Sequence, residues 1–196
     1  MNSPAPPEPY AVMMRRASVE GLPRHSLRDG FRIRGYRTGD EAVWLAVQRS
    51  AERFLPITDD LFRKEFGIDE GRLQKCMLFL EDPEGRPIGT ATAWHLPDRD
   101  APDCGRVHWI AIAEGAQGAG LGKALMSAVC ERLRAQGFRK LVLGTHVTRI
   151  PAINLYLAFG FLPEIRHADD LAEWRKLLPH LKDPVHLPAS APGATA

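Results

Sequence analysis

The sequence predicts one α/β (α+β) domain in which helices flank a mixed, mostly antiparallel central sheet. Three observations support this fold class. Apolar runs of strand length occur in both halves of the chain, amphipathic helical stripes interrupt them at irregular intervals, and a hairpin turn joins two of the runs. A regular repeat of strand and helix would instead indicate a parallel sheet. A length of 196 residues suits a single domain of this kind.

The first predicted elements are a strand and two helices. Residues 31–37 (FRIRGYR) alternate apolar and charged side chains, as a strand with one solvent-facing side does. Thr38 followed by Glu41 fits a capping box, and apolar side chains then recur at helical spacing as far as Phe54. A second, short helix is expected over residues 58–66, where two aspartates occupy the first turn.

A hairpin and a central strand are predicted next. The apolar runs at residues 76–82 and 87–96 flank a turn that contains Pro83 and Gly85. Residues 106–113 (RVHWIAIA) are almost continuously apolar, which indicates a buried strand in the middle of the sheet.

The same signals predict the rest of the chain. Helical periodicity, apolar runs and Pro/Gly boundaries give, in order, a helix from Leu121 to Gly137, a strand over 140–147, a short helix between Pro151 and Gly160, a strand within 161–166 and an amphipathic helix over 168–181.

Both ends of the chain have the composition of disordered segments. Residues 2–9 contain four prolines, and the last ten residues are LPASAPGATA. We therefore expect a disordered N-terminal extension over residues 1–29, an ordered domain over 30–181 and a disordered C-terminal tail over 182–196.

Composition excludes several classes of protein. The formal net charge of +2 gives no concentrated basic field of the kind that binds nucleic acid. Three widely spaced cysteines indicate neither a disulfide framework nor a metal site. No apolar run approaches the roughly 20 residues that span a bilayer, and no signal peptide is recognisable. We therefore expect a cytoplasmic protein without a metal, a membrane partner or a nucleic-acid partner.

The most informative local feature is the glycine-rich turn GAQGAGLGKAL at residues 115–125, between a buried strand and a helix. The first amides of a helix have no internal partners, and the helix dipole adds partial positive charge there. Glycines let the backbone approach a bulky anion, so a phosphate or diphosphate is a natural ligand. A tight turn without a ligand is the alternative. A P-loop needs Ser or Thr after Lys123, and a Rossmann turn needs a different glycine spacing, so neither motif fits.

Two stretches resemble the GNAT superfamily of N-acetyltransferases. Residues 117–122 (QGAGLG) resemble the family signature Q/R-x-x-G-x-G/A, and residues 152–161 (AINLYLAFGF) resemble its second motif, A-x-x-L-Y-x-x-x-G-F. Together with the order of the earlier elements, the resemblance covers about residues 30–165. Glu114 and Arg149 depart from the family pattern, since a proline and an asparagine are common at these positions.

The resemblance implies acetyl-CoA as the acyl donor. It implies that the diphosphate binds Gln117, Gly118, Ala119, Gly120, Leu121, Gly122 and Lys123. It also implies that the pantetheine arm lies along the preceding strand, near Ile110, Ala111 and Ile112, like an added strand.

The resemblance also suggests catalytic roles. Tyr156 matches the family tyrosine that protonates the leaving thiolate, and the backbone amide of Ile112 is the implied donor to the thioester carbonyl. His108 can act as the base that deprotonates the amine, although a structural histidine is an equal alternative. His146 and Glu114 are lesser candidates, and an acyl-carrier role for Cys104 is disfavoured. The acceptor pocket is expected among aromatic and histidine side chains: Trp44, Phe54, Phe62, Trp94 and His95.

The predicted function is transfer of an acetyl group from acetyl-CoA to a primary amine, by direct attack in a ternary complex. The amine belongs to an unidentified small molecule or peptide, and a homodimer is one assembly that the resemblance brings into consideration. The alternative is a catalytically inactive acyl-CoA-binding module with a regulatory or interaction role. A different glycine-loop nucleotide binder is a third, less favoured hypothesis.

Overall fold

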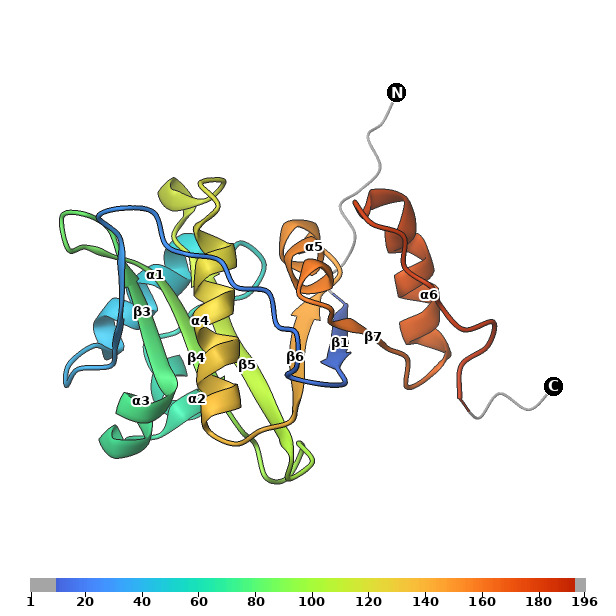
Figure 1. Ribbon diagram of the computed structural model, residues 1–196, viewed down its shortest axis with the longest axis horizontal. Coiled ribbons are helices and arrows are strands. Elements are labelled where there is room, and N and C mark those ends of the chain that lie inside the picture. The colour runs from blue at the N-terminus through green and yellow to red at the C-terminus, as the bar shows by residue number, and fades with distance from the viewer. Residues whose placement is uncertain (1–9, 193–196) are drawn as a thin grey trace.

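The computed structural model describes residues 10–192, which form one seven-stranded sheet with helices on both faces (Figure 1). The strands are β1 (Ala11–Arg16), β2 (Arg32–Gly35), β3 (Met77–Glu81), β4 (Pro87–Trp94), β5 (Cys104–Ile112), β6 (Lys140–His146) and β7 (Leu162–Glu164). The helices are α1 (Glu41–Ala51), α2 (Leu61–Phe66), α3 (Glu70–Cys76), α4 (Leu121–Ala135), α5 (Ile150–Ala158) and α6 (Ala168–Leu177). Short 3-10 helices occur before α4, at η1 (Glu114–Ala116), and after α6, at η2 (Leu178–His180).

The sheet is mixed and mostly antiparallel, so the predicted fold class is confirmed. The strand order is β2-β3-β4-β5-β6-β1-β7. Every neighbouring pair is antiparallel except β5 and β6, which run parallel. That parallel pair is connected through η1 and α4, as a parallel connection requires a crossover.

Two apolar clusters cover the two faces of the sheet. Alternate residues of β3 enter different clusters: Leu78 and Leu80 join one, and Met77 and Phe79 join the other. The first, here named the α4-face cluster, contains buried side chains of α4 together with Tyr156 of α5. The second, named the α1-face cluster, contains Trp44 of α1 and the phenylalanines of α2. The sheet therefore separates two independent layers of side chains.

The expected disorder of residues 1–29 is wrong for residues 11–16. This segment forms β1, which lies between β6 and β7 and pairs with both. Val12 and Met14 are 0% exposed, because the apolar run AVMM supplies alternate side chains to the core. Residues 1–9, which carry the prolines, lie outside the described residues.

The expected C-terminal tail at residues 182–196 is only partly described. Residues 182–192 contain no helix or strand, but they pack against the domain. The Ala189 carbonyl accepts a hydrogen bond from Arg175 of α6 at 2.7 Å, and Ala191 is buried. Residues 193–196 lie outside the part of the chain that the structure describes.

Two details of the helical region differ from expectation. Helix α3 was not predicted, because its sequence EGRLQKC is polar and contains a glycine; its one local signal is Asp69, whose side chain accepts a bond from the Arg72 amide at 3.0 Å. The expected capping box does not form. Thr38 donates to Glu70 at 2.7 Å instead, and Asp40 occupies the N-cap of α1.

Substitution of Met14 tests whether β1 belongs to the core. Met14→Ala removes a fully buried side chain, so we expect the free energy of unfolding to fall by about 2–5 kcal/mol, measured by chemical denaturation. Arg15→Ala, whose side chain is 48% exposed and pairs with Glu164, is the matched control and should cost about 1 kcal/mol or less. Equal, small effects of both substitutions would show that this segment is not part of the folded core.

Candidate active site

Strands β5 and β6 separate after a short paired region. Their parallel pairing covers only residues 104–106 of β5 and 140–142 of β6. Strand β5 continues to Ile112 with only β4 beside it, so its other backbone edge is open from residue 107 onward. Figure 1 shows the two strands diverging toward the end where α5 and the glycine turn lie. An open strand edge of this kind can accept an extended ligand as an added strand.

The glycine turn has open space at the positions where side chains would project from its backbone. Gly118 and Gly120 have φ angles of +78° and +80°, which a residue with a side chain adopts only with strain. A Cβ atom built at Gly115, Gly118 or Gly120 would meet nothing within 4 Å. The turn therefore leaves free space in front of its backbone, as a bulky anion requires.

A run of unpaired amides begins α4. Among the described residues, no acceptor bonds the backbone N–H groups of residues 118–122, and the N-cap residue Gly120 has no side chain to cap them. The amides of Gln117 and Lys123 differ, since they donate to the carbonyls of Glu114 and Gly120. Of the seven residues assigned to the diphosphate, five thus present free amides, and Lys123 presents an exposed ammonium group.

Charged and polar side chains surround this turn. Glu114, in the 3-10 helix η1 before the glycines, forms an ion pair with Arg53, two residues beyond the end of α1. That pairing offsets the negative charge of the carboxylate. The Gln117 side chain donates to the Ile112 carbonyl at 2.9 Å and so ties the turn to the end of β5.

Tyr156 lies on α5, on the far side of the open edge from β5. A Cβ atom at Gly122 would come within 3.5 Å of Leu155, which shows how closely α5 packs against the first turn of α4. Tyr156 is 6% exposed, and burial raises the pKa of its phenol to about 12, although Arg149 opposes the rise. The phenol is therefore protonated at neutral pH and able to donate a proton.

A bulge changes the direction of the side chains along β5. Thr92 pairs with His108 and Thr90 pairs with Ala111, so β5 has one residue more than β4 in this interval. Trp109 adopts φ +47° there. His108 and Trp109 consequently both contact the α1-face cluster, whereas Ile110 and Ile112 pack on the α4-face cluster. A regular strand would instead place His108 on the same face as these two isoleucines.

Glu65 of α2 binds both side chains of the bulge. Its Oε2 atom lies 3.0 Å from His108 Nε2 and accepts from Trp109 Nε1 at 2.8 Å. The His108 hydrogen bond lowers the pKa of Glu65, so this side chain is a carboxylate at neutral pH. Glu65 gave no signal in the sequence, because it lies 43 residues from His108.

The buried side-chain amide of a glutamine supports the bulge through hydrogen bonds. Gln48 of α1, which is 3% exposed, donates through Nε2 to Thr90 Oγ1 at 2.8 Å and to the Trp109 carbonyl at 3.1 Å. Thr90 also donates to this carbonyl, at 3.3 Å. A non-glycine residue with positive φ costs about 1–2 kcal/mol, so such support is needed to keep Trp109 in this conformation.

Other polar side chains near the site have structural partners. Arg106, two residues before His108 in β5, forms a buried ion pair with Asp100, in which Nε donates to Oδ2 at 3.0 Å. Arg149 pairs with Glu52 and so joins the start of α5 to the end of α1. Burial, and next the charge of Arg149, lower the pKa of His146, so its ring is neutral at pH 7. Burial raises the pKa of the Cys104 thiol, which argues against a nucleophilic role.

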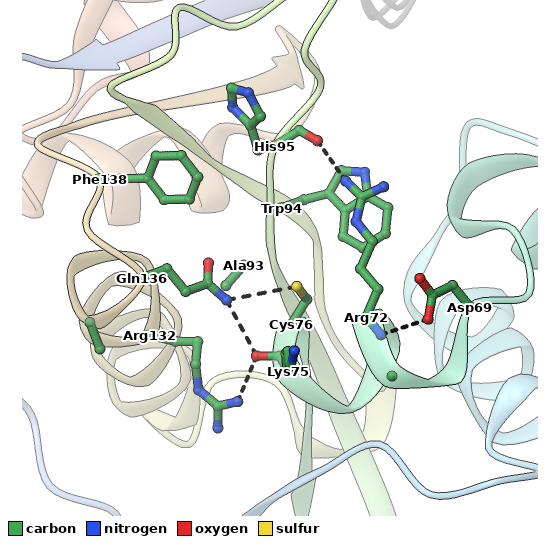
Figure 2. Close-up of a pocket in the computed structure, with 12 residues that line it drawn as sticks. Asp69, Arg72, Lys75, Cys76, Ala93, Trp94, His95, Arg132, Gln136 and Phe138 are labelled. Carbon is green, nitrogen blue, oxygen red and sulfur yellow. Dashed lines mark hydrogen bonds between the residues drawn. The ribbon is translucent and has the colours of Figure 1, made fainter.

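The aromatic residues expected in an acceptor pocket are mostly elsewhere. Trp44 and Phe62 are buried in the α1-face cluster and do not line an opening. Trp94 and His95 line a groove that residues of α3 and of the C-terminal half of α4 also border (Figure 2). Phe54 alone is exposed, beyond the end of α1. Within residues 10–192, no group of three His, Cys, Asp or Glu side chains could hold a metal ion, and no helix is long and apolar enough to cross a bilayer.

Comparisons with known proteins agree with this geometry. Residues 40–161 match the model of the Acetyltransferase (GNAT) family. The chain is 32% identical over 154 residues to a mycothiol acetyltransferase of Arthrobacter sp. (strain FB24), a match that covers 76% of this chain and 48% of the relative. It is 31% identical over 172 residues to the mycothiol acetyltransferase of Geodermatophilus obscurus, covering 84% and 54%. The chain thus spans about half the length of the curated relatives that it matches.

Solved structures show the same fold. A GCN5-related N-acetyltransferase from Sphaerobacter thermophilus superimposes with a TM-score of 0.66 at 18% identity, covering 81% of this chain and 49% of that one. The ribosomal-protein-S18-alanine N-acetyltransferase from Escherichia coli superimposes with a TM-score of 0.57 at 22% identity, covering 70% and 82%. The family match over residues 40–161, the similar relatives and the shared fold lead to one conclusion: the chain belongs to the GNAT family of acetyltransferases.

Proposed function

We propose that this chain is an N-acetyltransferase that moves an acetyl group from acetyl-CoA to a primary amine by direct attack in a ternary complex. The observation that carries the proposal is the run of five free amides at residues 118–122, beside the open edge of β5. Because a Cβ atom at Gly115, Gly118 or Gly120 would meet nothing within 4 Å, the residues present fit a diphosphate. Acetyl-CoA then supplies the activated thioester.

The donor is held mainly by backbone groups. The free amides of residues 118–122 and the Lys123 ammonium bind the diphosphate, with Gln117 holding the turn in place. Backbone groups of Ile110, Ala111 and Ile112 bind the pantetheine arm along the open edge of β5. The Ile112 amide remains the implied donor to the thioester carbonyl oxygen.

His108 is the proposed base, and Glu65 positions it. Glu65 holds Nε2, which leaves Nδ1 to take a proton from the attacking ammonium group, directly or through one water molecule. The nearby carboxylate also stabilises the imidazolium ion that results. The neutral amine nitrogen can then form its bond to the thioester carbon.

Tyr156 is the proposed acid. As the carbon–sulfur bond breaks, the sulfur takes the electron pair of that bond and the phenol donates its proton to it. The nitrogen loses its second proton as the amide forms, and a proton from solvent restores the Tyr156 phenol. The released products are an acetylated amine and the free thiol of CoA. The Glu65–His108 pair favours this enzyme over the inactive acyl-CoA-binding module, because an inactive module has no need of a histidine on β5 that is held by a carboxylate.

The acceptor is a primary amine of a small molecule or a peptide. The mycothiol acetyltransferases that resemble this chain support acetyl transfer as the reaction class. We place the reaction in the cytoplasm, since Cys76, Cys104 and Cys130 are all free thiols, as is usual in a reducing compartment. A homodimer, and the lack of a nucleic-acid partner, remain predictions.

A substitution in the glycine turn tests donor binding. Gly120→Ala forces a side chain into φ +80° and disturbs the free amides, so we expect the Kd of acetyl-CoA to rise by about tenfold, or 1.4 kcal/mol, in calorimetry. Gly137→Ala is the matched control: Gly137 has φ +93°, equally open surroundings and a place at the other end of α4. A similar loss of affinity in both variants would contradict the assigned donor site.

Substitution of Tyr156 by phenylalanine, which removes only the phenol oxygen, tests its role as the proposed acid. Tyr156→Phe should lower kcat by about 100-fold or more while leaving the KM for acetyl-CoA unchanged, measured by release of the CoA thiol. Since the phenol pKa is about 12, the wild-type group stays in its donating form across the neutral range and loses it only at strongly alkaline pH. No residue of the described chain bonds the phenol, so the melting temperature should change little. An unchanged kcat would remove Tyr156 from the mechanism.

Substitution of Glu65 tests the Glu65–His108 pair. In Glu65→Gln the side chain no longer carries the negative charge that stabilises an imidazolium ion, so kcat should fall by about tenfold, measured by release of the CoA thiol. Glu84→Gln, which removes an exposed carboxylate in the β3–β4 turn, is the control and should leave kcat unchanged. An unchanged kcat in Glu65→Gln would contradict the positioning role of Glu65.

A further inference from the structure

A second concave site lies at the other end of α4 from the glycine turn. Residues of α3, of the end of β4 and of the C-terminal half of α4 line a groove of about 670 Å³ (Figure 2). That volume is within the range of about 300–1,000 Å³ that is usual for small-molecule sites. Arg132 follows Gly122 by ten residues, roughly 15 Å along a helix axis at 1.5 Å per residue, so the groove is separate from the proposed donor site.

Three cationic side chains border this groove. Arg72 and Lys75 come from α3 and Arg132 comes from α4, and Figure 2 shows Arg132 on the opposite side of Cys76 from Arg72. In the part of the chain that the structure describes, no carboxylate oxygen lies within 4.0 Å of any of their side-chain nitrogens. The single acidic residue of the lining, Asp69, is engaged as the N-cap of α3. Three cations against one carboxylate leave the lining of the groove with a net positive charge.

The positive charges of all three side chains act on the Cys76 thiol. Burial raises the pKa of this thiol, and a hydrogen bond from Gln136 and then the charges of Arg72, Arg132 and Lys75 oppose the rise. Arg132 also donates to the Lys75 carbonyl at 2.8 Å, which fixes α3 against α4. The three positive charges thus surround Cys76 in a groove whose two helices are joined by a hydrogen bond.

Planar groups form the rest of the surface. The central carbon of the Arg72 guanidinium lies over the Trp94 ring, 3.7 Å from the ring centroid, and this group donates to the His95 carbonyl at 2.8 Å. His95 in turn stacks on Phe138, with ring centroids 5.3 Å apart. Trp94 is 3% exposed, so it supports the guanidinium from below. Flat cationic and aromatic faces of this kind favour stacking of a ligand ring.

We propose that this groove is a second ligand site, which takes a small dianion bearing a planar aromatic ring system. The ring stacks against Arg72, His95 and Phe138, and the anionic group binds Lys75 and Arg132. Charge complementarity selects the anion, and the planar surface selects the ring.

The test is calorimetric titration with adenosine 5′-monophosphate as the probe, in saturating CoA so that the glycine turn is filled. Adenosine supplies the ring alone and ribose 5-phosphate supplies the dianion alone, so both should bind at least about tenfold more weakly than the complete probe if each part contributes about 1.4 kcal/mol. Added salt should weaken the binding, because the cations are exposed to solvent.

Lys75→Gln is the informative variant, since no described residue bonds the Lys75 ammonium group and its loss leaves the backbone contact with Arg132 intact. We expect the Kd of the probe to rise by about threefold to tenfold in this variant and in Arg132→Gln. Arg134→Gln, on the same helix but outside the groove, is the control with the same change of charge. Thermal unfolding confirms that each variant is folded.

Failure of the probe to bind at millimolar concentration would overturn the proposal. Equal weakening by Lys75→Gln and Arg134→Gln, or adenosine binding as tightly as the complete probe, would do so too. Calorimetry reads binding directly, so these outcomes are independent of whether the chain transfers acetyl groups.

Discussion

The early end of pairing between β5 and β6 is the constraint on which the candidate site depends. The two strands share only three residue pairs, after which β4 is the one described strand that pairs with β5. A parallel neighbour along the whole strand would have consumed the backbone groups that an extended ligand needs. The same divergence leaves room for the first turn of α4 on one side and for α5 with Tyr156 on the other. The proposed donor site, the proposed acid and the open edge of β5 therefore share one structural cause.

The bulge at Trp109 arranges the other half of the chemistry. In a regular strand His108 and Trp109 would point to opposite faces, and one carboxylate could not reach both. The extra residue in β5 brings both to Glu65, while Gln48 and Thr90 bond the Trp109 carbonyl from α1 and β4. Because all of these groups are packed, the strain of φ +47° is retained in the folded state. The proposed base is thus positioned by α1 and α2, which contribute no residue to the family motifs.

Local patterns account for what the sequence predicted and for what it missed. Hydrophobic periodicity and glycine spacing are properties of neighbouring residues, so the elements from β2 onward, apart from α3, and the free amides at residues 118–122 could be anticipated. Strand β1 was missed because proline-rich composition masks the run AVMM, and its partner β6 lies more than 120 residues away. Glu65 and Gln48 were missed because their roles exist only once the bulge has formed. Long-range contacts of this kind produce no periodic pattern in the amino-acid sequence.

Helix α4 brings two different kinds of positive charge to its two ends. At the glycine turn the charge comes from unpaired backbone amides and the helix dipole, which no side-chain substitution elsewhere on the helix removes. At the other end the dipole is negative, and side chains of α3 and α4 have to supply the charge. Backbone amides are directed and rigid, which suits a diphosphate held in one register for chemistry. The charged groups of arginine and lysine lie on flexible side chains and can bind more than one anion. This property suits recognition of a ligand that is bound and released unchanged.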